Sequence, residues 1–167
     1  MGERYPLPME DTPARRRWYR KYMRELDEIQ GITYDHNVAD QLYEELLDDD
    51  HWDFWVPVTH GRKVVGFFTM CPPPHCHPDV NYFLRDAYVR PQYRRLGAMQ
   101  KAVTRWLKLY PGKYNLLVLK SNKPAYLCWL KVFEEAGYEP MDLRPLEEFD
   151  DIEDDIVMLG FKPKEET

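Results

Sequence analysis

Two arginines and a glycine stand where a strand-like run of the sequence meets a helix-like run. Arg94 and Arg95 precede Gly97, and apolar residues with helical spacing follow. A helix N-terminus presents unpaired backbone N–H groups and partial positive charge, arginines grip phosphate oxygens in pairs, and glycine lets a ligand approach the backbone. The segment therefore predicts a phosphate-binding turn, and the alternative is a surface turn that carries arginines.

The elements that must position this turn follow from the spacing of the apolar residues. Helical spacing and strand-like runs predict the order strand, two helices, three strands, helix, strand, helix and two strands. The strand–helix–strand order within residues 82–119 predicts a parallel crossover. The predicted strands are 5–9, 56–58, 64–70, 82–89, 114–119, 138–143 and 156–161, and the predicted helices are 13–30, 38–47, 97–110 and 122–137.

Composition bounds the class of protein. A chain of 167 residues is predicted to form one domain, residues 1–167, and its net charge of −6 argues against a nucleic-acid partner. No run approaches the roughly 20 apolar residues that span a bilayer, and the start does not resemble a signal peptide, so we expect a cytoplasmic protein without a membrane partner. The odd number of cysteines favours free thiols.

The opening segment resembles the pyrophosphate-binding signature of the GNAT superfamily of N-acetyltransferases. That signature reads Arg or Gln, two variable residues, Gly, one variable residue, then Gly or Ala. Arg94, Gly97 and Met99 take its three key places, with Met99 replacing the usual small residue. The order of elements is similar to that of the family over nearly the whole chain. Residues 122–125 resemble the start of a later helix of the family, and 133–138 resemble its end.

The resemblance implies an α/β fold, with a mixed, mostly antiparallel central sheet of about six to seven strands flanked by about four helices. It also implies a site for acetyl-CoA as co-substrate. The backbone of Tyr88 and Val89 would pair with the pantetheine arm, and Asn122 would hydrogen-bond near the thioester. The pyrophosphate would lie on the backbone amides of Arg94, Arg95, Leu96, Gly97, Ala98 and Met99.

The implied reaction transfers the acetyl group directly to a primary amine of a small molecule or a protein. It needs a base for the amine and an acid for the departing thiolate. Asp86 matches a position where many relatives carry a carboxylate, and the alternative is an acidic residue paired with Arg85. Tyr126 is the candidate acid, with simple packing as the alternative. Trp129 stands where a tyrosine often acts in the family, and indole cannot supply the proton.

Two groups of residues suggest other chemistry. Cys128 is interpreted as a packing residue rather than an acyl-accepting nucleophile, because no histidine is near it in sequence. Zinc-binding residue types gather in one proline-rich loop, but their spacing matches no closed zinc pattern, so no metal is expected. They are Cys71, His75, Cys76 and His77.

Other functions stay compatible with the sequence. Another acyl-CoA donor is the first alternative, and a binding module with this fold and no catalysis is the second. Arginines of the first helix, Arg15, Arg16 and Arg17 among them, lie opposite its apolar side, so they are predicted to face solvent and would suit an acidic partner. Acidic blocks at 48–53 and 150–155 would suit a cationic amine, and a homodimer is equally compatible.

Overall fold

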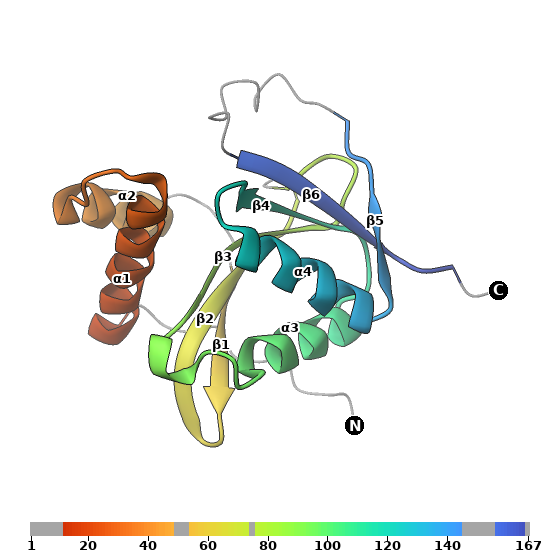
Figure 1. The fold of residues 1–167 in the computed structure, drawn as a ribbon, viewed down its shortest axis with the longest axis horizontal. Coiled ribbons are helices and arrows are strands. Elements are labelled where there is room, and N and C mark those ends of the chain that lie inside the picture. Colours follow the sequence, from red (N-terminus) through yellow and green to blue (C-terminus); the bar gives the residue numbers. More distant parts are fainter. Residues whose placement is uncertain (1–11, 49–53, 74–75, 145–155, 166–167) are drawn as a thin grey trace.

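A six-stranded sheet lies at the centre of the computed structural model, which describes residues 12–48, 54–73, 76–144 and 156–165 (Figure 1). The order of strands along the sheet is β1-β2-β3-β4-β6-β5. The strands are β1 Phe54–His60, β2 Lys63–Cys71, β3 Tyr82–Val89, β4 Tyr114–Leu119, β5 Tyr138–Met141 and β6 Ile156–Pro163. The helices are α1 Pro13–Gln30, α2 His36–Asp48, α3 Ala98–Leu109 and α4 Lys123–Glu135, with a short 3-10 turn η1 at Pro91–Tyr93.

The pairing of the strands confirms the predicted fold class. Among the described strands β3 and β4 run parallel, joined through α3 as the crossover prediction required, and the other neighbours are antiparallel. The last-but-one strand ends at Met141 rather than 143. Beyond it, Arg144 donates hydrogen bonds to both carboxylate oxygens of Asp79. The predicted strand 5–9 lies outside the described residues.

The parallel pair is short and then opens. Tyr82–Leu84 pair with Tyr114–Leu116, but β3 continues to Val89 and β4 to Leu119. On their other sides, β2 accompanies β3 as far as Val89 and β6 pairs with the whole of β4. Each strand therefore keeps one partner, while the two edges that face each other carry backbone polar groups that need a different one.

The face of the sheet covered by α3 and α4 holds the larger apolar core (Figure 1). Trp106 of α3 packs edge-on against Phe68 of β2. Phe133 of α4 lies stacked on Phe161 of β6, with ring centroids 4.1 Å apart. Burial of these large rings is the main stabilising contribution that this face makes.

The opposite face, under α1 and α2, is aromatic but also charged. Tyr19 of α1 and Tyr43 of α2 pack with Trp55, Phe67 and Tyr88 of the first three strands. α1 begins where the Thr12 side chain accepts a hydrogen bond from the amide of Arg15, and it ends at Gly31. This helix also carries the residues that reach the largest gap in the sheet, between β3 and β4.

The prediction that the α1 arginines face solvent is wrong for Arg15. Only 4% of Arg15 is exposed. Its Nε donates a 2.7 Å hydrogen bond to the hydroxyl of Tyr43, and its guanidinium lies 4.4 Å from the centre of the Trp55 ring. A long side chain at the edge of the apolar stripe can bury its stem and reach aromatic faces, so helical position alone misplaced it.

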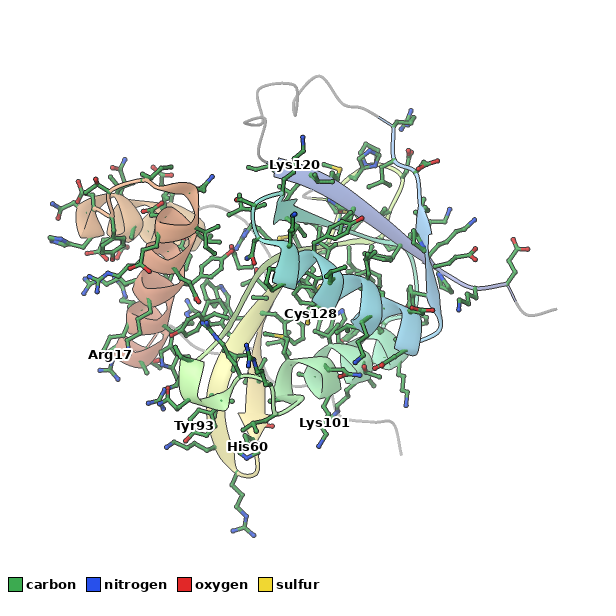
Figure 2. The ribbon with its side chains drawn as sticks, in the orientation of Figure 1. Arg17, His60, Tyr93, Lys101, Lys120 and Cys128 are labelled. Carbon is green, nitrogen blue, oxygen red and sulfur yellow. The ribbon has the colours of Figure 1, made fainter. Side chains whose placement is uncertain are left out.

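Two further arginines of α1 are engaged by the acidic residues of α2. Arg16 pairs with Glu44, and Arg20 donates hydrogen bonds of 2.6 and 2.7 Å to the two oxygens of Asp40. Arg17, by contrast, is exposed on the outer side of α1 (Figure 2). The arginine-rich segment thus serves mainly to join the two helices, which weakens the hypothesis of a face for an acidic partner.

Candidate active site

A cavity of about 330 Å³ lies where β3 and β4 separate. The two strands supply its base through residues 84–87 and 116–119. Helix α1 lines one side, α4 the other, and the first residue of β6 closes an end. The contributing helix and strand residues are Tyr22, Leu26, Gln30, Asn122, Ala125, Trp129 and Ile156. The gap in the sheet is therefore a hollow walled by side chains, with one helix on each flank.

Asp86 of β3 lines this cavity and is 9% exposed. Thr69 of β2 holds it twice: the Thr69 hydroxyl donates to Asp86 Oδ2 over 3.1 Å, and the backbone amide of Asp86 donates to Thr69 Oγ1 over 2.9 Å. Arg85 Nε also donates to Oδ2 over 2.7 Å. The predicted ion pair between Arg85 and Asp86 is thus present, and it lies inside the candidate site rather than away from it.

Tyr22 of α1 meets Asp86 across the cavity wall. Burial raises the pKa of the Tyr22 phenol well above its ordinary value, and the nearby negative charge of Asp86 raises it further. Burial also raises the pKa of the neighbouring Tyr19, with a smaller contribution from Asp86. A phenol in this environment stays protonated and acts as a hydrogen-bond donor.

Asn122 lines the cavity from the N-terminus of α4. Its side-chain oxygen accepts a 3.4 Å hydrogen bond from the amide of Ala125, so it caps the helix while facing the hollow. Ala125 and Trp129 line the cavity too, one turn apart on the same side of α4. Tyr126, the predicted acid, does not line it and is 37% exposed. The structure therefore brings Asn122 and Asp86 to one cavity and leaves Tyr126 beside it.

The phosphate-binding turn predicted at residues 94–99 leads into α3. Arg95 and Gly97 have left-handed backbones, with φ of 64° and 78°, and α3 begins at Ala98. No side chain among the described residues caps this helix start. The first backbone N–H groups of α3 are therefore available to an anion, and glycine relieves the strain that any other residue would carry at Gly97.

Arg94 at the start of this turn already has an acidic partner. Its guanidinium donates to both carboxylate oxygens of Glu25 on α1, with Nη2 and Oε2 separated by 2.7 Å. Its Nε donates to the carbonyl oxygen of Val89 over 2.9 Å. Tyr88 is buried beneath this corner, with its ring 5.7 Å from the Arg94 guanidinium. The arginine of the turn is thus fixed to both β3 and α1.

Three residues of the site were missed by sequence reasoning. Tyr22 packs with the aromatic cluster under α1, and helical spacing carries no information about which strand its side chain meets. Thr69 and Glu25 act through partners on other elements, Asp86 and Arg94. No local pattern could have found them, because each contact is created by the tertiary arrangement.

The chain matches the model of the acetyltransferase (GNAT) family over residues 13–138, which includes the turn, the strands β3 and β4 and the whole of α4. The chain belongs to this family. Acyl transfer is therefore its class of reaction. Among curated proteins, none matches the chain.

Solved structures give the same fold for this GNAT chain. An acetyltransferase from Thermus thermophilus superposes with a TM-score of 0.61 at 13% identity and 92% coverage of each chain. An aminoglycoside 6'-N-acetyltransferase complexed with coenzyme A gives 0.55 at 13% identity, with 95% of this chain and 98% of that one covered. A spermidine N-acetyltransferase from Vibrio cholerae, in complex with CoA and spermine, gives 0.57 at 14%, covering 92% and 90%.

The described cysteine and histidine side chains lie outside the residues that line the cavity. His77 is buried and uses both ring nitrogens: Nδ1 accepts from the Asp79 amide over 3.0 Å, and Nε2 lies 2.9 Å from the Arg144 carbonyl oxygen. The described residues include no group of three or more potential metal ligands, and His75 lies outside them. Cys128 is exposed on α4, not packed as predicted, and partial burial raises the pKa of its thiol (Figure 2).

Within the part of the chain that the structure describes, no helix combines the length and apolar character needed to cross a bilayer.

Proposed function

We propose that the protein transfers the acetyl group of acetyl-CoA directly to a primary amine. The observation that carries this proposal is the cavity between β3 and β4 with a buried carboxylate, Asp86, in its wall. Two solved relatives of the same fold, described above, carry coenzyme A, and both are N-acetyltransferases. The proposed acceptor is a class of compound, the primary amines.

The cofactor site is proposed along the open edge of β3 and the start of α3. Tyr88 and Val89 lie where β3 has lost β4 as a partner, so amides of a pantetheine arm would pair with backbone groups on that edge, beside the Val89 carbonyl that already accepts from Arg94. The turn from Arg94 through Arg95, Leu96, Gly97 and Ala98 to Met99 would hold the pyrophosphate on the N-terminus of α3. Asn122 would meet the thioester end, because it lines the same cavity as Asp86.

Asp86 is the proposed base. The neutral amine attacks the thioester carbon, a carbon–nitrogen bond forms, the carbon–sulfur bond breaks, and Asp86 takes the proton that the amine loses. Its hydrogen bonds to Thr69 and Arg85 both end on Oδ2, so lone pairs of Oδ1 remain for the acceptor or a bridging water. Asp86 would thus accept the proton of the amine on Oδ1 without a change in the position of its side chain.

Tyr126 stays the proposed acid that protonates the departing thiolate. It neighbours Ala125 in the cavity wall, but its own side chain lies outside the lining. Tyr126→Phe removes only the hydroxyl, so the pH–rate profile is the appropriate measurement. Unaltered turnover at every pH would show that water or another group supplies the proton.

Cofactor binding is tested first by melting temperature with acetyl-CoA, CoA and a longer acyl-CoA. Ligand at a hundred times its dissociation constant adds about 2.7 kcal/mol of stability, which raises the melting temperature by roughly 5–10 °C for a chain of this size. Gly97→Glu, which places a carboxylate at the turn, should abolish the shift. Gly137→Glu is the matched control, because that glycine also has positive φ and open space around it but lies after α4. No shift with any acyl-CoA would overturn the cofactor proposal.

Turnover is tested by following free thiol release with a panel of primary amines. Asp86→Asn should lower kcat by about 10²–10⁴-fold without loss of the thermal shift. Asp79→Asn is the control, because this carboxylate pairs with Arg144 outside the cavity. Shift without turnover for any amine would favour the alternative of a binding module. Faster turnover with another acyl donor would favour the alternative of a different acyl group.

A further inference from the structure

Helix α1 forms one wall of the cavity with side chains that nothing above assigns to the reaction. Tyr22 lines the cavity together with Leu26 and Gln30 of the same helix. Its ring packs on Phe67 with centroids 6.2 Å apart and planes at 76°. Asp86 lines the same cavity, close enough for its charge to raise the pKa of the phenol. The sheet therefore holds the Tyr22 ring beside the cavity that the carboxylate lines.

The other partners of Asp86 leave a defined task for this phenol. Thr69 and Arg85 both bind Oδ2, and both come from the sheet itself. Two donors on one oxygen fix the position of that atom. A further donor from α1, outside the sheet, would fix how the carboxylate is turned toward the cavity.

We propose that Tyr22 is a positioning residue for acetyl transfer: its phenol orients the Asp86 carboxylate toward the acceptor amine and makes α1 the acceptor-side wall of the cavity. The inference rests on the proposed function, because it assumes that Asp86 receives the proton of the amine. Tyr22 itself exchanges no proton in this scheme. Its role is to keep the base in one orientation from one catalytic cycle to the next.

The groups around Asp86 determine the pH effect of removing the phenol. Arg85 faces it from β3, Tyr19 and Tyr22 face it from α1, and β2 contributes only the uncharged Thr69. Hydrogen bonds to a carboxylate favour its charged form. Loss of a hydrogen bond from Tyr22 should therefore move the acidic limb of the kcat/KM profile to higher pH.

The decisive comparison is Tyr22→Phe against Tyr19→Phe. Both changes remove one buried hydroxyl from α1 and keep the ring, but Tyr19 does not line the cavity and packs instead on Tyr43 and Trp55. Tyr22→Phe should lower kcat about tenfold and shift the acidic limb, with the KM for acetyl-CoA and the thermal shift on binding it unchanged. Tyr19→Phe should leave kcat and the acidic limb at their wild-type values.

A measurement without turnover tests the same contact. The ring-carbon NMR signal next to the Tyr22 hydroxyl, assigned by its absence in Tyr22→Phe, reports ionisation of that phenol. Because burial first and Asp86 second raise the pKa of Tyr22, Asp86→Asn should let the signal titrate at lower pH than in the wild type.

The outcomes separate this inference from the proposed function. A wild-type protein that acetylates no amine overturns both. An active wild type with Tyr22→Phe equal to it in kcat and acidic limb overturns only the role of Tyr22, as does a Tyr22 signal that titrates identically in Asp86→Asn. A tenfold loss together with both pH shifts supports it.

Discussion

The two faces of the sheet are stabilised by different chemistry. Under α3 and α4 the contacts are between apolar side chains, such as the stacked rings of Phe133 and Phe161. Under α1 and α2 aromatic rings alternate with arginines and carboxylates, as at Arg15 and Trp55. This difference indicates which face can change its contacts locally. Apolar packing is lost as a whole when it loosens, whereas one polar contact can be exchanged for another without disturbing the rest.

The face under α1 also reaches both halves of the proposed site. Tyr22 lines the cavity together with Asp86, and Glu25, less than one turn later, pairs with Arg94 at the phosphate-binding turn. The two residues are three apart and so lie on one side of the helix. α1 is therefore attached to β3 at the proposed base and just beyond it at the proposed cofactor turn, while α3 and α4 supply the rigid support.

The largest change in the free energy of unfolding is expected from a substitution in the apolar face under α3 and α4. Phe133 is fully buried and stacks on Phe161, so Phe133→Ala should reduce the free energy of unfolding by about 3–5 kcal/mol through lost burial and the cavity left behind. Leu127→Ala, on the same helix but 62% exposed, should change it by less than about 0.5 kcal/mol. Denaturant unfolding measures both. Equal effects for the two variants would contradict the assignment of the core to this face.

A smaller effect is expected from the charged face. Arg15→Ala removes the hydrogen bond to Tyr43 and the contact with the Trp55 ring, so it should cost about 2 kcal/mol of unfolding free energy. Arg17→Ala, two positions later and exposed, should be within about 0.5 kcal/mol of the wild type. Matching melting temperatures for the two variants would mean that the buried arginine contributes no more than a surface one.

Sequence patterns predicted the elements better than the contacts between them. Periodicity located the helices and strands because each buries one side. Asp86 and Asn122 were proposed from the resemblance to the family, and the structure brings both to one cavity. Arg15 was misplaced and the role of Tyr22 was missed for one reason. Periodicity tells which side of a helix faces the protein, but the partner on that side comes from strands far along the chain.

The smallest expected effect concerns the tie between α1 and the turn. Glu25 holds Arg94 and also places a negative charge beside the proposed pyrophosphate site. Both side chains are 37% exposed, and a pair this open contributes no more than about 1 kcal/mol. Glu25→Gln should therefore tighten acetyl-CoA binding by roughly two- to fivefold, with little change in stability.

The salt dependence of acetyl-CoA binding by Glu25→Gln tests whether the polar contacts of the α1 face are exchangeable. Screening weakens exposed charge pairs, so the difference between Glu25→Gln and the wild type should shrink as ionic strength rises from low salt to about 1 M. Glu28→Gln is the matched control. It removes the same charge from α1, about one turn nearer the C-terminal end of the helix, and the ion pair with Arg94 is formed by Glu25 instead. Calorimetric titration with acetyl-CoA at the two salt concentrations measures the effect. Weaker binding in Glu25→Gln would instead mean that Glu25 holds Arg94 in the orientation that the cofactor needs, so that the polar tie of α1 would be a fixed support rather than an exchangeable contact.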